Sequence, residues 1–451
     1  MSNSKYILDF FKVCVRLIQI IITTFSKLSL DLILKMPYNY IKKEVLKMLK
    51  REAEEVIKNI NKTFKVLLVT GPRQVGKTTL LRSLMPEDMT YISLDDQTLR
   101  EQARLNPRGF LEENPGKLFI DEVQYAPELF PYIKLLVDES NDMGQFWLSG
   151  SQKFHLMKGV SESLAGRGGI VNLNRFSYSE LIENDKKILF TPNNYKKSDY
   201  INVNDLFEVI FNGGMPHYNL VEDMNRDLFF ESYINTYIER DVRSLTQVGD
   251  ELAFRNFLIS IASRTGEQLN YSSISKEVGI TDVTAKKWLS ILVTSGLVYL
   301  LEPYKSTKLK RVTHMPKIIF MDTGLCAYLA GWDDARSLQL SSNAGHYLET
   351  YIISELIKSY DSKGTKLNIS YYRDKDKNVI DLIITKNNIL YPYEIKKTST
   401  PTISMLKNFD KLNASDKEIG IGGIICCYDR LMMINENNYV IPVSSVINAS
   451  E

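Results

Sequence analysis

One short run constrains the fold of this chain more than any other feature. Gly71 to Thr79 reads GPRQVGKTT and fits the pattern G-x-x-x-x-G-K-T. An apolar run at 65–70 precedes it and predicts a strand, and an apolar-periodic stretch follows it and predicts a helix. A strand, a glycine-rich loop and a helix in this order predict a phosphate-binding loop (P-loop, or Walker A motif) within an α/β sheet.

The loop residues predict how ATP and Mg²⁺ would be bound. Gly71 and Gly76 allow backbone turns that a side chain would block, so that backbone N–H groups and the positive end of the following helix converge on the phosphates. Lys77 would neutralise the β- and γ-phosphate oxygens, and the Thr78 hydroxyl would bind Mg²⁺. The predicted ATP-binding residues are Gly71, Pro72, Arg73, Gln74, Val75, Gly76, Lys77, Thr78, Thr79 and, from a later strand, Ser151.

Two adjacent acids end a second apolar run, KLFIDEV at 117–123. Asp121, at the predicted strand tip, would bind Mg²⁺, and Glu122 would polarise the attacking water, as phosphoryl transfer to water requires. Two acids at a strand end are often an ordinary solvated turn, but their position after a P-loop favours the catalytic interpretation. We therefore expect hydrolysis as well as binding.

Two weaker sequence signals also concern the nucleotide site. The next predicted strand ends in Ser149 and Ser151, with Gln152 after them, and one of these groups could sense the γ-phosphate. Arg167 lies between glycines in SLAGRGG. It is a candidate arginine finger for the nucleotide of a neighbouring subunit, and a surface arginine in a loop is the equally open alternative.

Length and pattern predict several domains. A chain of 451 residues is too long for one core. Short apolar runs alternate with helical patterns between 65 and 176, which predicts a buried parallel sheet. Residues 203–265 look helical, and the segment ISKEVGITDVTAKKWLSILVTSGLVYLLEPY then has the element order of a winged helix-turn-helix.

The helix-turn-helix segment makes DNA a candidate partner. Lys286 and Lys287 lie on its second predicted helix, and a basic group follows it at Lys305, Lys308, Lys310, Arg311, His314 and Lys317. Basic residues at this density favour phosphate contacts. The alternative is that the same lysines only solvate a packing module.

A second group of acids lies in the C-terminal third. Glu349 is on a predicted helix, Asp381 is in the strand NVIDLII, and Glu394 and Lys396 share one face of the strand YPYEIKK. Carboxylates around a divalent cation, with a lysine that orients water, are the chemistry of metal-dependent phosphodiester cleavage. The D-x12-ExK spacing resembles that of the PD-(D/E)xK nucleases. An ordinary solvated sheet face is the alternative.

Several motifs in order resemble one family. The runs GPRQVGKTTLL, LFIDEVQYAPELF, LSGSQKF, SLAGR and YIERDVR are similar to those of prokaryotic AAA-type ATP-binding proteins that carry a C-terminal domain of unknown function. The resemblance implies an ATPase domain, a winged helix and a restriction-endonuclease-like fold. With it, the expected domains are an N-terminal helical extension at 1–47, a P-loop ATPase domain at 48–200, a helical and winged-helix region at 201–310 and a restriction-endonuclease-like domain at 311–451.

Net charge, cysteine spacing and the apolar run near the N-terminus limit the expected partners and cellular compartment. Net charge is +2, so any basic surface must be local. The cysteines form no CxxC pair, which predicts a reduced, cytoplasmic chain. The run at 10–34 is interrupted by charges, so we expect an amphipathic helix rather than a spanning one, with a peripheral membrane anchor as the alternative.

The sequence leaves three functions to weigh. The first is an ATPase that couples nucleotide state to a DNA-binding, nuclease-like C-terminal half. The others are a non-hydrolytic scaffold or switch that binds protein partners, and an ATP-gated metal-dependent nuclease. Homo-oligomer formation stays open, and an arginine finger at Arg167 would require it.

Overall fold

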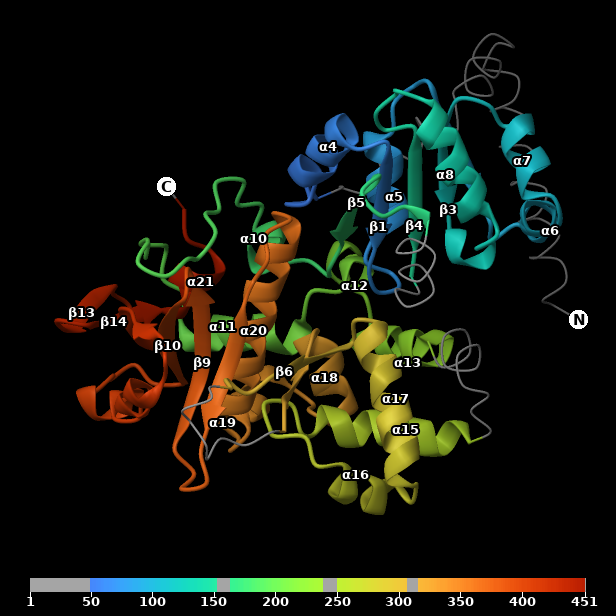
Figure 1. Ribbon diagram of the computed structural model, residues 1–451. Helices are drawn as coiled ribbons and strands as arrows, with labels where there is room; N and C mark the ends of the chain where they lie inside the picture. Colours follow the sequence, from blue (N-terminus) through green and yellow to red (C-terminus); the bar gives the residue numbers. More distant parts are fainter. Residues whose placement is uncertain (1–48, 152–162, 238–249, 306–314, 451) are drawn as a thin grey trace, which may run out of the picture. The chain divides into compact units, whose positions relative to one another are not determined.

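The computed structural model describes residues 49–151, 163–237, 250–305 and 315–450, and Figure 1 shows their helices and strands. The expected N-terminal extension at 1–47 therefore lies outside the described residues. So do Gln152 and the basic residues Lys308, Lys310, Arg311 and His314. Residues 50–451 form one contact unit.

The first part of the chain is built on a five-stranded parallel sheet. Its order is β2-β3-β4-β1-β5, and every described strand pair in it is parallel. The strands are β1 (Val66–Thr70), β2 (Met89–Ser93), β3 (Lys117–Asp121), β4 (Phe146–Gly150) and β5 (Gly168–Asn172). The parallel sheet expected from the apolar runs between 65 and 176 is thus confirmed.

Helices cover both faces of this sheet (Figure 1). They are α4 (Glu54–Thr63), α5 (Lys77–Leu84), α6 (Gln97–Leu105), α7 (Pro107–Glu113) and α8 (Leu129–Glu139), with a 3-10 turn η1 (Val123–Tyr125). The short helix α10 (Tyr178–Leu181) follows β5 and lies beside the later helix of residues 344–362. Successive side chains of a strand point to opposite faces. Val66 and Leu68 accordingly pack in the core with α8, whereas Leu67 and Val69 pack in the core with α4 and α5.

The middle part is mainly helical, as expected for 203–265. Its helices are α11 (Val203–Asn212), α12 (Pro216–Leu220), α13 (Arg226–Tyr237), α15 (Glu251–Ala262), α16 (Tyr271–Val278), α17 (Asp282–Thr294), α18 (Thr323–Leu329) and α19 (Ala335–Leu340). Between α17 and α18 lie two antiparallel strands, β6 (Val298–Leu301) and β7 (Lys317–Phe320).

The turn between α16 and α17 forms as its residues dictate. Gly279 ends α16 in the left-handed region at φ 77°, a conformation that glycine adopts without cost. Thr281 then caps α17 by accepting a hydrogen bond from the N–H of Thr284. The helix buries Trp288 and Leu289 in the core. The order helix, turn, helix and strand pair follows the sequence pattern, and the winged-helix assignment stays a prediction.

The C-terminal part is a mixed sheet packed against one long helix (Figure 1). The order is β13-β14-β12-β10-β9-β8, with β11 beside β10. The elements are α20 (Ala344–Ser362), β8 (Ile369–Arg373), β9 (Val379–Lys386), β10 (Ile389–Lys396), η3 (Ile403–Leu406), η4 (Phe409–Ala414), β11 (Glu418–Ile419), β12 (Gly422–Cys426), β13 (Met432–Asn435), β14 (Asn438–Pro442) and α21 (Val443–Ile447). One core joins this sheet to the middle helices.

Two further expectations concern membrane-spanning helices and the state of the cysteines. Among the described residues, no helix combines the length and the apolar character needed to cross a bilayer. Cys326, Cys426 and Cys427 are buried free thiols.

Candidate nucleotide site

The P-loop lies at the carboxyl edge of the parallel sheet, between β1 and α5. Gly71 packs so tightly that a Cβ placed on it would be 2.1 Å from the carbonyl oxygen of Leu173. Gly76 precedes α5 in the left-handed region at φ 85°. Both positions therefore require glycine, which confirms the expected backbone turns and leaves the loop's N–H groups at the start of α5.

Lys77 is the first residue of α5, and its side chain is buried. Its ammonium group donates hydrogen bonds to the carbonyl oxygens of Gly71 (3.0 Å) and Pro72 (2.8 Å). The ammonium is thus already directed along the loop that is expected to hold the phosphates. Binding of a phosphate there would exchange these carbonyl acceptors for phosphate oxygens.

Three strand ends and the loop meet around Asp121. The Thr78 hydroxyl donates to Asp121 Oδ2 at 2.7 Å. The Ser149 hydroxyl donates to the other carboxylate oxygen, Oδ1, and the Tyr91 hydroxyl lies 3.3 Å from Oδ2. Thr78 and Asp121 come from segments 43 residues apart, so the fold joins the two residues predicted to bind Mg²⁺. A hydroxyl and a carboxylate are oxygen ligands that Mg²⁺ prefers.

Glu122 follows Asp121 in an unusual backbone conformation. Its φ is 55°, in the left-handed region, where a non-glycine residue carries strain that often marks a functional position. Its carboxylate accepts a hydrogen bond from the side-chain amide of Gln124. The two adjacent carboxylates therefore have different partners: Asp121 binds the Thr78 hydroxyl, and Glu122 binds the Gln124 amide.

The surroundings of Glu122 suit a group that accepts a proton. Burial raises the pKa of its carboxyl above the usual value, and Lys77 is the strongest of the groups that oppose the rise. Arg73 also lies close enough to lower the pKa slightly. A general base is most effective when its pKa approaches the working pH, so the net upward direction favours proton transfer to Glu122.

The remaining predicted loop residues take different places. Val75 is buried, whereas Gln74 is exposed and has a φ of 60°. Thr79 continues α5 behind the loop. Ser151 is buried after β4, and its Oγ has no hydrogen-bond partner within the part of the chain that the structure describes. A buried hydroxyl without a partner fits the expected contact to a ligand.

Arg167 lies far from these groups within its own chain. It directly precedes β5, whose first residue pairs with Val66 at the start of β1, so it is at the amino edge of the sheet, opposite the P-loop. Its guanidinium pairs with Asp138 of α8, with Nη2 at 2.9 Å from Oδ2. Any catalytic role of Arg167 would have to be exerted on another subunit, and that role stays a prediction.

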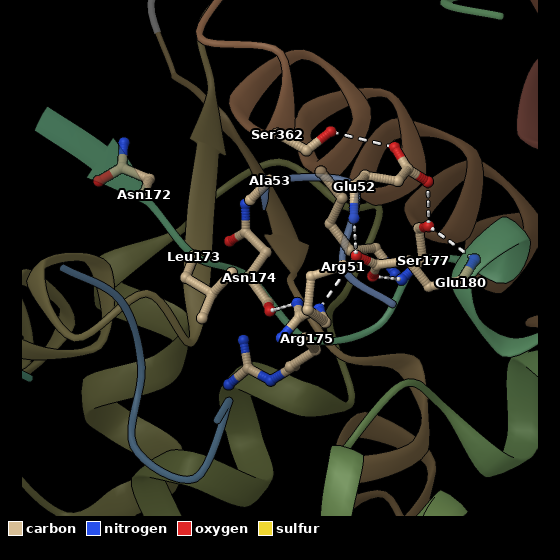
Figure 2. A pocket seen from close by; sticks show the side chains of 11 residues that line it. Arg51, Glu52, Ala53, Asn172, Leu173, Asn174, Arg175, Ser177, Glu180 and Ser362 are labelled. Atoms are coloured by element: carbon tan, nitrogen blue, oxygen red, sulfur yellow. Dashed lines mark hydrogen bonds and ion pairs between the residues drawn. The ribbon is translucent and has the colours of Figure 1, made fainter. Parts of the chain in front are cut away.

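Arg51 is a residue of this region that the sequence did not single out. It is 7% exposed, and its guanidinium donates to the Val75 carbonyl of the P-loop at 2.8 Å. Figure 2 shows the same side chain reaching Asn174 and Glu180. The distances are 2.6 Å from Nη2 to the Asn174 carbonyl and 3.0 Å from Nε to Glu180 Oε1. Arg51 thus fixes the P-loop to the segment that follows β5.

That segment, residues 172–180, is also bound to the other parts of the chain. The side chains of Lys358 and Glu355 in α20 bind the Phe176 carbonyl (3.0 Å) and the Tyr178 N–H (2.9 Å). Arg175 donates to the carbonyl of Gly296, after α17, at 2.9 Å. A Cβ on Gly296 would in turn be 2.9 Å from the ring of Pro72 in the P-loop. The loop is therefore in direct contact with the middle part of the chain.

The predicted C-terminal site residues also come together. Lys396 Nζ lies 2.7 Å from Asp381 Oδ2 and 2.6 Å from Glu394 Oε2. Glu349 faces the same group from α20. Yet among the described residues no three His, Cys, Asp or Glu side chains are arranged to hold a metal ion. The expected metal-binding role of Glu349, Asp381 and Glu394 stays a prediction.

One interpretation from the sequence needs correction here. Lys317 was grouped with basic residues that face DNA, but it is 5% exposed and its ammonium lies 2.5 Å from Glu349 Oε1. The run KIIF of β7 is buried at all four positions, which the sequence pattern alone did not reveal for its first residue. Lys317 therefore belongs to the C-terminal acids.

Three family models match successive parts of the chain. They are an AAA domain at 63–182, a domain of unknown function (DUF8612) at 203–336 and a second domain of unknown function (DUF4143) at 344–446. Uncharacterized proteins of Mycobacterium bovis and Mycobacterium tuberculosis are each 29% identical over 342 residues, which is 75% of this chain and 72% of the relative.

Likenesses to solved structures are weak. A DNA replication initiation factor has a TM-score of 0.22 and 17% identity, over 48% of this chain and 66% of that chain. A signal transduction ATPase with a tetratricopeptide repeat sensor from Pyrococcus horikoshii has a TM-score of 0.22 and 13% identity, over 70% of this chain and 47% of that chain. The chain thus spans less than two thirds of both structures, and at these scores we infer nothing from them.

The AAA-domain match covers the five strands and the P-loop. Residues 63–182 are therefore an AAA-type ATPase region, in which the P-loop, Asp121 and Glu122 stand at one edge of the sheet. The order of an AAA domain followed by domains of unknown function agrees with the family resemblance. The winged-helix and restriction-endonuclease-like folds stay predictions.

Proposed function

We propose that this protein is a Mg²⁺-dependent ATPase whose nucleotide state is passed to its C-terminal half. The observation that carries the proposal is the hydrogen bond of 2.7 Å between Thr78 of the P-loop and Asp121, with Glu122 directly beside it. A phosphate-binding loop, two oxygen ligands for a metal and a half-buried acid of raised pKa are the groups that phosphoryl transfer to water requires.

Each residue has a role in the proposed reaction. Backbone N–H groups of the loop and Lys77 bind the phosphate oxygens and offset the charge that develops on them. Thr78 and Asp121 would hold Mg²⁺, which supplies Lewis-acid stabilisation of the phosphates when bound. Glu122 accepts a proton from the attacking water while the oxygen of this water bonds to the γ-phosphorus. The bond from the γ-phosphorus to the bridging oxygen then breaks, and its electron pair leaves with ADP.

Contacts of the P-loop support the coupling part of the proposal. Arg51 binds Val75 within the loop and Glu180 beyond β5. Pro72 packs closely against Gly296, two residues after the end of α17, where a Cβ would be 2.9 Å from the Pro72 ring. A shift of the loop on nucleotide binding would therefore be passed to the middle part and to α20 through these contacts.

Substitution of Glu122 tests the proposal. Glu122→Gln keeps the size of the side chain and one acceptor oxygen but removes its charge and basicity. The variant should bind ATP with the affinity of the parent and lose about 10²–10⁴-fold in turnover, the range for removal of a general base. ATP affinity is measured by calorimetry with Mg²⁺, and turnover by release of inorganic phosphate.

Glu112→Gln is the matched control, because Glu112 is an exposed acid of α7 that pairs with Arg108 in the same helix. It should leave both quantities unchanged. Unchanged turnover in Glu122→Gln would remove this residue from the mechanism. A parent protein that binds ATP tightly but never releases phosphate would favour the alternative of a non-hydrolytic switch.

DNA binding is a second candidate, favoured by the exposure of α17. Lys286 and Lys287 are exposed on this helix while Trp288 and Leu289 are buried. A double Lys286→Gln, Lys287→Gln variant should bind duplex DNA more weakly and reduce the slope of log affinity against log salt by about 2, one for each lost phosphate contact. Fluorescence anisotropy measures both, and an unchanged slope would exclude these lysines as contacts.

A further inference from the structure

The C-terminal cluster, which we define as Lys317, Glu349, Asp381, Glu394 and Lys396, contains a cation of its own. We infer that Lys317 takes the position at which a divalent metal would bind, so that lysine pairs with the carboxylates of the cluster and no metal binds there while Lys317 is in place. This inference is independent of the proposed ATPase function, because it concerns a different group of residues.

The distances place the Lys317 ammonium between two carboxylates. It lies 2.5 Å from Glu349 Oε1 and 3.9 Å from Asp381 Oδ1. Glu349 comes from α20, Asp381 from β9 and Lys317 from β7, so three separate elements converge on one charge. A metal bound by Glu349 and Asp381 together would have to lie between them, where the ammonium already is.

A second lysine pairs with the remaining carboxylate of the cluster. Lys396 Nζ lies within 2.7 Å of both Asp381 and Glu394. Three carboxylates therefore face two ammonium groups, and each carboxylate has an ammonium neighbour. Burial makes such pairing necessary, because an unpaired buried charge is unfavourable. A divalent ion that entered beside both lysines would be repelled by two positive charges in a poorly solvated site.

Lys317 is also held firmly in place. The backbone of β7 pairs with β6, with Lys317 opposite Leu301. The Ile318 N–H donates to the carbonyl of Glu267 at 2.9 Å. The ammonium lies 5.2 Å from the centroid of the Tyr371 ring, whose face attracts cations. The backbone of Lys317 is therefore fixed and its ammonium has favourable contacts in its buried position. Metal-dependent cleavage at this cluster would first require Lys317 to leave this position.

Removal of the lysine should create a metal site. Lys317→Met keeps the aliphatic stem but leaves Glu349 and Asp381 facing each other. We compare full-length parent and variant without nucleotide, both with Asp121→Asn so that the P-loop binds no metal, and titrate Mn²⁺ by electron paramagnetic resonance. The variant should bind one Mn²⁺ at least about tenfold more tightly than the parent, and Mn²⁺ should raise its melting temperature but not that of the parent.

A second variant separates this result from general damage. In Lys317→Met, Glu349→Gln, one charge of each sign is removed, so the protein should fold without metal and bind Mn²⁺ no better than the parent. Folded Lys317→Met without any gain in Mn²⁺ affinity would overturn the inference. If Lys317→Met fails to fold, the test uses the parent alone. Mn²⁺ binding by the parent that Asp381→Asn abolishes would overturn the inference, and the absence of such binding would support the inference.

Discussion

Arg51 makes a strong prediction because one buried side chain serves three partners. Arg51→Met preserves most of the aliphatic volume and removes the guanidinium. The change deprives Glu180 of its ion pair at 3.0 Å and the carbonyls of Val75 and Asn174 of their donors at 2.8 and 2.6 Å. The side chains of Arg51 and Glu180 are only 7% and 5% exposed, so water cannot replace the lost contacts fully.

The magnitude follows from this burial. Removal of one partner from a buried ion pair costs about 3–5 kcal/mol. Glu180 keeps the backbone N–H groups of Glu52 (2.8 Å) and Ser177 (2.9 Å), which places the expected loss of unfolding free energy at the lower end, about 3 kcal/mol. For a cooperative unit of about 400 residues, the melting temperature should fall by roughly 4 °C.

A double-mutant cycle with Glu180→Gln measures the pair itself. Chemical unfolding of the two single variants and the double variant should give a coupling energy of about 1–3 kcal/mol. ATP affinity should also decrease in Arg51→Met, because the Val75 carbonyl is no longer fixed. Arg104→Met is the control, since Arg104 forms an exposed pair with Glu128 and should cost less than about 1 kcal/mol. Additive single effects, or a loss in Arg51→Met as small as in the control, would refute the reasoning.

Three further predictions concern the same region. Burial raises the pKa of the Glu52 carboxyl, but Lys187 and the hydroxyls of Ser177 and Ser179 outweigh burial and lower this pKa to about 2, from 4.5. The ionised carboxylate therefore stabilises the fold above pH 4.5, and this stabilisation is lost as the pH falls towards 2. Between pH 7 and pH 3, Glu52→Gln should lose about 2 kcal/mol less unfolding free energy than the parent in urea unfolding, and an equal loss would contradict the pairing. Gly71→Ala, which places a Cβ against the Leu173 carbonyl, should weaken ATP binding and cost at least about 1–3 kcal/mol of stability, whereas Gly345→Ala, which has nothing within 4 Å, should cost little in the same melting experiment. Lys77→Ala should weaken ATP binding by about 10–100-fold in calorimetry, and unchanged affinity would exclude the P-loop as the nucleotide site.

The nucleotide half could be predicted because its signals are local. Apolar runs such as the one at 65–70 identify buried strands, and the glycines at 71 and 76 serve backbone turns that are close in sequence. The meeting of Thr78 with Asp121 also followed from the pattern, because carboxyl ends of parallel strands share one edge of a sheet.

What the sequence did not reveal depends on residues far apart in the chain. Arg51 contacts Glu180 across 129 residues, and neither residue belongs to a recognisable motif. Lys317 was misassigned because a lysine at the start of a short strand is usually exposed, and only its neighbours Glu349 and Asp381 explain its burial. Arg167 precedes β5 and so lies at the amino edge of the sheet, and its proposed action on another subunit stays a prediction.

The contacts of residues 172–180 with α20 have a practical consequence for dissection of the chain. A fragment cut near residue 200, where the sequence suggests a boundary, would lack Glu355 and Lys358. The Tyr178 N–H and the Phe176 carbonyl would then need new partners, and the buried Arg175 would lose the Gly296 carbonyl. The isolated ATPase piece is thus expected to be a poor substitute for the intact protein in any enzymatic assay.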